Sequence, residues 1–137
     1  FMEQIVLSFA ASCADSPVEF TSRLSPDLPV IKWDRIKLRE VFLNLLRNAR
    51  ESIKGTGAIR LDASCTSTEI IVTIEDTGCG IPEEHLPHIF EPFVTYKKGG
   101  TGLGLAIADR TVRAHGGEIA VTSAVDTGTR FRILLPV

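Results

Sequence analysis

Gly100-Thr101-Gly102-Leu103-Gly104-Leu105 is the stretch that decides how this chain is interpreted, because its glycines lead directly into a helical pattern at 103–115. A loop that feeds a helix N-terminus suits an anion, since the unpaired backbone N–H groups and the helix dipole both favour negative charge. Glycine also lets the backbone approach a phosphate without a Cβ in the way. The stretch therefore predicts a phosphorylated ligand.

The same glycines have three other interpretations. Loop glycines often serve only a turn, and these residues alone leave that alternative open. A Rossmann fingerprint needs a strand directly before the glycines, whereas residues 93–99 have the composition of a loop. A P-loop needs a Gly-Lys-Ser/Thr sequence, which does not follow here. Other motifs in the chain are needed to distinguish a simple turn from an anion site.

Composition indicates a single globular domain. The chain has 137 residues with 44% hydrophobic and 23% charged residues, which are ordinary values for such a domain. A net charge of −2 gives no reason to expect nucleic acid as a partner. Cys13, Cys65 and Cys79 are odd in number and lack metal-type spacing, which favours reduced thiols in a cytoplasmic domain. No apolar run has the length of a membrane span. The chain begins at Phe1, so we expect a piece of a longer protein.

Hydrophobic periodicity predicts an α+β sandwich. Helices are expected at 2–13, 35–53 and 103–115, with at most a short helix at 83–89. A long loop at 90–102 is expected to be functional or mobile, since such loops are uncommon in compact domains. Strands are expected at 18–25, 30–33, 58–65, 69–75, 117–123 and 129–135. This order of elements favours helices packed on one face of a sheet.

The helix expected at 35–53 has an apolar stripe and a polar stripe. Asn44 and Asn48 are one turn apart on the polar stripe, so their side chains project the same way. A solvated face is the simpler explanation, although asparagine is a poor helix former. The carbonyl oxygen of an asparagine can bind Mg²⁺, which takes its other ligands from water and substrate phosphates. The pair therefore predicts a metal that arrives with a nucleotide.

The segment Asp76-Thr77-Gly78-Cys79-Gly80-Ile81 follows an apolar strand. A carboxylate at this place can accept a hydrogen bond from an exocyclic amine, and the two glycines let a flat base lie close to the backbone. An ordinary turn at the end of a strand explains the segment equally well when it is taken alone.

The motifs together are more specific than any one of them. In their order they resemble the ATP-binding catalytic domain of sensor histidine kinases, within the superfamily that includes the Hsp90 and MutL ATPases and DNA gyrase. Asn48 to Ser52 and Phe93 to Lys98 look closest to the nitrogen-regulation subgroup of these kinases. The matching segments are an N box at Asn44–Ala49, a G1 box at Glu75–Ile81, an F box at Ile89–Phe93 and a G2 box at Gly100–Leu105.

The resemblance implies a two-layer α/β sandwich, in which a mixed, mainly antiparallel sheet has three helices on one face. Asp76 would bind the adenine amino group, helped by Thr129 through a hydroxyl or a water. Asn48 would coordinate Mg²⁺, and Asn44 would support it or the phosphates. Residues implied to shape the adenine pocket or to hold the phosphates of ATP are Gly78, Gly80, Gly100, Thr101, Gly102, Leu103 and Gly104, with Arg50, Lys97 and Lys98 as candidate cations. Phe90 and Phe93 would anchor the loop, unless they are simply core residues.

The resemblance also implies partners. Sensor kinases transfer the γ-phosphoryl group to a histidine on a separate dimerisation domain, and from there to the receiver domain of a response regulator. The whole protein would be a homodimer, with or without a membrane anchor. His85, His88 and His115 match no phosphoacceptor motif and are expected to be structural or surface residues. We therefore expect the chain to bind ATP but not to phosphorylate itself.

Three other functions stay open. ATPases of the Hsp90 and MutL type carry a Glu general base where this chain has Asn44, which argues against water activation. An anti-sigma-factor serine kinase would be a complete chain of about this size. A module that only senses nucleotide would be expected to have lost some of the motif residues.

Overall fold

A five-stranded sheet forms one layer of the protein. The computed structural model describes residues 1–96 and 99–137. The strands follow the spatial order β1-β2-β3-β5-β4, with β1 parallel to β2 and the other pairs antiparallel. Their bounds are β1 Val18–Leu24, β2 Gly57–Cys65, β3 Glu69–Asp76, β4 Glu118–Ala124 and β5 Gly128–Pro136. The prediction of a mixed, mainly antiparallel sheet is confirmed.

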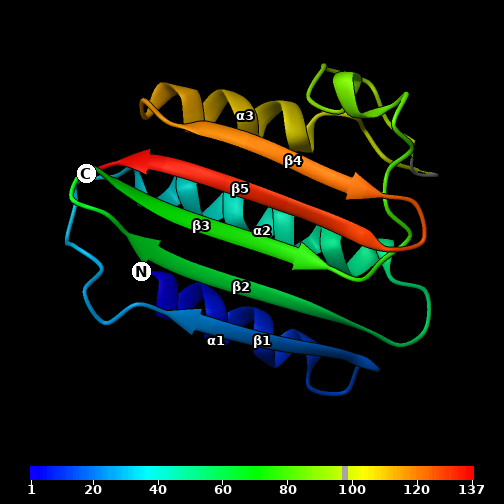
Figure 1. The fold of residues 1–137 in the computed structure, drawn as a ribbon, viewed down its shortest axis with the longest axis horizontal. Coiled ribbons are helices and arrows are strands. Elements are labelled where there is room, and N and C mark those ends of the chain that lie inside the picture. Colours follow the sequence, from blue (N-terminus) through cyan, green and yellow to red (C-terminus); the bar gives the residue numbers. More distant parts are fainter. Residues whose placement is uncertain (97–98) are drawn as a thin grey trace.

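Three helices form the second layer, behind the sheet in Figure 1: α1 (Met2–Cys13), α2 (Arg35–Ser52) and α3 (Gly104–Ala114). The long central helix α2 begins where Asp34 accepts a hydrogen bond from the Lys37 N–H at 3.1 Å. Such an N-cap satisfies one of the unpaired donors of the first turn. The predicted two-layer sandwich with all three helices on one face is therefore confirmed.

The core lies between the sheet and the helices. The apolar stripe of α2 is buried, and Leu38, Phe42 and Leu45 have no exposed surface. Alternate residues of the central strands point toward this stripe, and Leu61 and Val72 are likewise fully buried. The predicted helical stripe and the predicted strand alternation meet in this one core.

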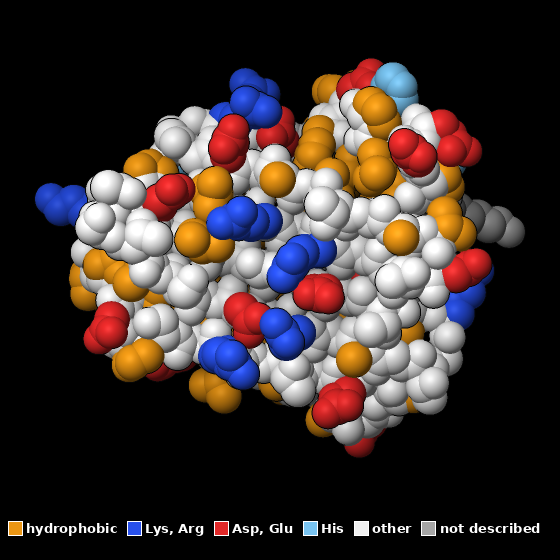
Figure 2. Space-filling model, in the orientation of Figure 1, with side chains coloured by type: hydrophobic (Ala, Val, Ile, Leu, Met, Phe, Trp, Pro, Cys, Tyr) orange, Lys and Arg blue, Asp and Glu red, His pale blue; other side chains and the backbone are white. Residues whose placement is uncertain are grey.

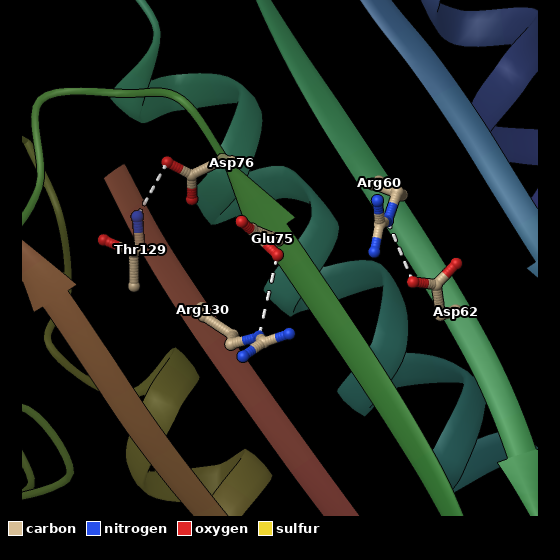
Figure 3. A network of polar contacts seen from close by, with 6 residues as sticks. All are labelled: Arg60, Asp62, Glu75, Asp76, Thr129 and Arg130. Atoms are coloured by element: carbon tan, nitrogen blue, oxygen red, sulfur yellow. Dashed lines mark hydrogen bonds and ion pairs between the residues drawn. The ribbon is translucent and has the colours of Figure 1, made fainter. Parts of the chain in front are cut away.

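The opposite face of the sheet is polar and charged, as Figure 2 shows. Arg60 and Asp62 on β2 are joined from Nε to Oδ2 at 2.9 Å, and Glu75 pairs with Arg130 across β3 and β5 at 3.6 Å (Figure 3). A face of this composition can remain in water, so the sheet needs helices on one side only.

One prediction about secondary structure differs from the structure. Residues 30–33 form no strand, and the Val30 side chain is fully exposed at 102%. Pro29 lacks an N–H group, and the segment lies outside the strand order of the sheet, so its β-branched residues have no ladder to join. The segment 83–89, where at most a short helix was expected, contains one turn of 3-10 helix at Leu86–His88, in agreement with that expectation.

Within the described ranges 1–96 and 99–137, no helix combines the length and the apolar character that crossing a membrane requires.

Candidate functional site

Asp76 is the last residue of β3 and is one of the buried charged side chains, with 5% of its surface exposed. Its Oδ1 accepts hydrogen bonds from the Gly78 N–H at 2.8 Å and the Thr129 N–H at 3.3 Å. The Ser52 hydroxyl, 3.1 Å away, shares its one hydrogen between this oxygen and the Ala49 carbonyl oxygen at 2.7 Å. Figure 3 shows the carboxylate beside Thr129, its register partner on β5. A buried carboxylate needs such donors, and these three fix its position at the end of the sheet.

The predicted glycines of the loop after β3 lie where a side chain would collide with its neighbours. A Cβ on Gly78 would be 2.0 Å from Ser52 Oγ. Gly80 has a φ of +73°, and a Cβ there would be 2.1 Å from the Ala124 carbonyl oxygen. Both contacts are closer than non-bonded atoms tolerate, so this loop can pack against α2 and β4 only with glycine at these positions.

The start of α3 packs against the polar stripe of α2. A Cβ on Gly104 would be 2.8 Å from both Oδ1 and Nδ2 of Asn44. The structure thus brings the first asparagine to the N-terminus of the helix that the glycine run begins, where backbone N–H groups are unpaired. Asn48, one turn further along α2, is half-buried. Two segments that are far apart in the sequence form one edge of the candidate site.

Arg50 lies on a different side of α2. It follows Asn48 by two residues, which is about 200° around an α-helix. This cation therefore does not lie on the stripe of the two asparagines. Its role at the phosphates stays a prediction. Lys97 and Lys98, the other predicted cations, lie outside the described residues.

The loop before α3 is tied to the aromatic segment. The Phe93 N–H donates to the Gly102 carbonyl oxygen at 2.9 Å, and a Cβ on Gly102 would be 2.5 Å from the Phe93 carbonyl carbon. Phe90 packs edge to face on Phe131 with ring centroids 6.3 Å apart. Phe93 is 76% exposed, so Phe90 alone of this pair anchors the segment through its ring. Gly100 and Thr101 are exposed, and the Thr101 hydroxyl accepts from the Leu103 N–H at 3.4 Å.

Two serines of the site were missed by the sequence analysis. Ser52 contacts Asp76, as described above, and the Ser123 hydroxyl lies 2.8 Å from that of Thr129. The signals were present: Ser52 is one turn after Asn48 on α2, and Ser123 and Thr129 were predicted as the facing ends of a hairpin.

The histidines have structural contacts, in agreement with the prediction from sequence. His85 stacks on Tyr96 with ring centroids 3.7 Å apart, and His88 pairs with Glu91. His115 bonds the Thr111 carbonyl oxygen through Nδ1 at 2.8 Å and accepts from a backbone N–H through Nε2 at 3.3 Å.

A separate cavity of about 460 Å³ lies at the other end of the strands. Its lining includes Glu69 at the start of β3, Glu118 at the start of β4, and Gly116 and Gly117 after α3. It contains none of the predicted site residues. It therefore offers a rival place for a ligand, against which the candidate site can be tested.

Known proteins resemble this chain over its whole length. A sequence model of the family described as histidine kinase-, DNA gyrase B- and HSP90-like ATPases matches residues 33–137. Signal transduction histidine-protein kinase AtoS of Escherichia coli strain K12 is 37% identical over 99% of this chain. Sensory histidine kinase/phosphatase NtrB of Rhodobacter capsulatus is 42% identical over 82% of it. The chain spans only 22% of AtoS and 35% of NtrB.

A solved structure shares the fold. The catalytic domain of histidine kinase ThkA superimposes with a TM-score of 0.86 at 28% identity, over 98% of this chain and 90% of that one. ThkA has also been solved in complex with response regulator protein TrrA; that chain matches at a TM-score of 0.81 and 26% identity, over 98% of this chain and 39% of the other.

Proposed function

Because the chain belongs to the family of histidine kinase-, DNA gyrase B- and HSP90-like ATPases, we propose that it is the ATP-binding catalytic domain of a sensor histidine kinase. The matches to AtoS, NtrB and ThkA, all named histidine kinases, favour this member of the family over the ATPases that share the fold. Those ATPases would need a general base at position 44, and the asparagine found there is a poor base, which agrees with that choice.

The observation that carries the proposal is the buried Asp76 carboxylate at the end of β3, beside Thr129 at the start of β5. The Asp76 carboxylate is buried and held by three donors, and Thr129 lies directly beside it. An exocyclic amine would find a charged acceptor here, while Gly78 and Gly80 let a flat base approach the backbone. The phosphates would then extend toward Gly104 and the N-terminus of α3.

A calorimetric titration of the chain with ATP tests this proposal. We expect saturable one-to-one binding, and competition by ADP. Absence of saturable binding would contradict it.

The residues also fit Mg²⁺. Among the residues that the structure describes, no three His, Cys, Asp or Glu side chains cluster as a metal site would require. A magnesium ion held by one amide oxygen, water and substrate phosphates needs no such cluster. We assign Asn48 as the protein ligand. Asn44, which lies against Gly104, would support the ion or the phosphates of bound ATP. The ion would neutralise phosphate charge when ATP is bound.

Replacing Asn48 by Ala should reduce affinity for ATP about tenfold in Mg²⁺ and less than about twofold in EDTA, because only the first condition contains the ion. Titrations of the unmodified chain and of Asn48→Ala with ATP, in Mg²⁺ and in EDTA, measure the two losses of affinity. Asn48→Asp keeps an oxygen ligand and should retain most of the dependence on Mg²⁺. Equal losses with and without the ion would rule out a metal ligand at this position.

The phosphoryl acceptor belongs to the rest of the proposed kinase. ATP supplies the γ-phosphoryl group, and this chain would contribute mainly by binding and orienting it. A histidine on a separate dimerisation domain of a homodimer would receive the group, and a response regulator would take it in turn, as the ThkA–TrrA complex suggests by analogy.

Incubation with ATP labelled at the γ-phosphate should leave this chain without acid-labile label, because none of its three histidines lies in a phosphoacceptor motif. Adding a helical domain that carries the phosphoacceptor histidine should give labelling of that domain. Stoichiometric acid-labile label on the chain alone would contradict this division of roles.

A further inference from the structure

Ser123, near the end of β4, joins the loop after β3 to the β4–β5 hairpin. Its hydroxyl oxygen lies 2.7 Å from the Ile81 nitrogen, 3.0 Å from the Gly128 carbonyl oxygen and 2.8 Å from Thr129 Oγ1. A hydroxyl has one hydrogen and two lone pairs, so three partners use its full capacity. Each of the three contacts therefore has a fixed donor and a fixed acceptor.

Two of the three directions follow from the chemistry of the partners. A backbone N–H can only donate, so Ser123 accepts from Ile81. A carbonyl oxygen can only accept, so the single hydrogen of Ser123 goes to Gly128. The remaining contact can be a hydrogen bond only if the hydroxyl of Thr129 donates to Ser123. The hydrogen of Thr129 is therefore used within the protein.

This direction determines what Thr129 can offer to a ligand. Having donated its hydrogen, Oγ1 has only lone pairs left, and the Asp76 carboxylate that bonds the Thr129 N–H at 3.3 Å is also an acceptor. Both side chains at this end of the sheet would then accept hydrogen bonds. The 6-amino group of adenine donates, whereas the 6-oxo group of hypoxanthine presents an acceptor and would meet like polarity.

We propose that Ser123 is a positioning residue that makes Thr129 an acceptor and so sets the preference of the site for a 6-amino purine over a 6-oxo purine. The inference rests on the proposed nucleotide site, and it concerns which base that site selects. A threonine whose hydroxyl hydrogen is free could turn it toward a 6-oxo group and tolerate either base.

Affinities for ATP and ITP test this, because the two nucleotides share the sugar and the triphosphate. The ratio of their dissociation constants therefore reports on the base. The unmodified chain should prefer ATP. Ser123→Ala should lower that preference about fivefold to tenfold, since Thr129 regains a hydrogen that the 6-oxo group can accept. Ser123→Thr keeps the hydroxyl and should keep the preference.

Two further variants separate this role from a general effect on structure. Thr122→Ala changes the neighbouring, exposed residue of β4 and should leave the ratio unchanged. In a Thr129→Val background the hydroxyl is absent, so Ser123→Ala should no longer alter the ratio. If Ser123→Ala does not fold, Ser123→Cys, whose thiol is a weak acceptor, should lower the preference by a smaller factor.

The outcomes are distinct. A lowered ATP preference in Ser123→Ala that disappears without the Thr129 hydroxyl supports the inference. Equal weakening of ATP and ITP would show a merely structural role and overturn it, while leaving the proposed function intact. A chain that binds neither nucleotide before any substitution would overturn the proposed function as well.

Discussion

Asp76→Asn should weaken ATP binding about 100-fold, because a hydrogen bond to a charged acceptor contributes roughly 1.5–3 kcal/mol. Asparagine keeps one oxygen, which can retain the three bonds that reach Oδ1 from Ser52, Gly78 and Thr129. Its NH₂ group replaces the other oxygen and would face the adenine amine, donor against donor. The variant should therefore fold but bind the adenine base weakly. Calorimetric titration measures its affinity for ATP, and thermal unfolding measures its stability.

Glu75→Gln is the matched control for this substitution. Glu75 is the preceding residue, but its carboxylate lies on the open face of the sheet and pairs with Arg130 at 3.6 Å (Figure 3). An exposed ion pair contributes little, so affinity for ATP should change less than about twofold. If the two variants bind ATP equally well, the assignment of Asp76 to the adenine is wrong.

Gly80→Ala should lower the free energy of unfolding by about 2–5 kcal/mol. At a φ of +73° a residue with a Cβ is strained by about 1–2 kcal/mol. The new Cβ would also be 2.1 Å from the backbone oxygen of Ala124, and forcing that strand to move costs about 1–3 kcal/mol. Urea unfolding monitored by circular dichroism measures the sum.

Gly55→Ala separates the two causes. Gly55 has a φ of +84°, but a Cβ there would meet nothing within 4 Å. It should therefore show the strain alone, about 1–2 kcal/mol. A Gly80→Ala variant no less stable than Gly55→Ala would mean that the loop after β3 does not pack on β4 as the structure shows.

The parts of the fold that depend on local periodicity were predictable. Leu38, Phe42 and Leu45 recur at helical spacing and Leu61 alternates along its strand, so burial of one face follows from geometry within a few residues. Residues 30–33 were predicted wrongly because β-branched composition indicates a strand only where a neighbouring strand is available, and a single segment does not show its neighbours.

The candidate site divides in the same way. Asp76, Asn44 and Gly104 were identified because their residue types carry the chemistry themselves. Ser52 and Ser123 act through other residues, so their importance depends on contacts between segments that are 24 and 42 residues apart. Only the folded structure brings those segments together.

The most direct test of the central claim is to locate the nucleotide by the amide chemical shifts of the ¹⁵N-labelled chain during titration with Mg-ATP. The two ends of β3, which has eight residues, are about 23 Å apart, so they are easily distinguished. We predict that the largest shifts occur at Gly78, Thr129 and Gly104. Largest shifts at Gly116 and Gly117, beside the cavity at the other end of the strands, would contradict the account.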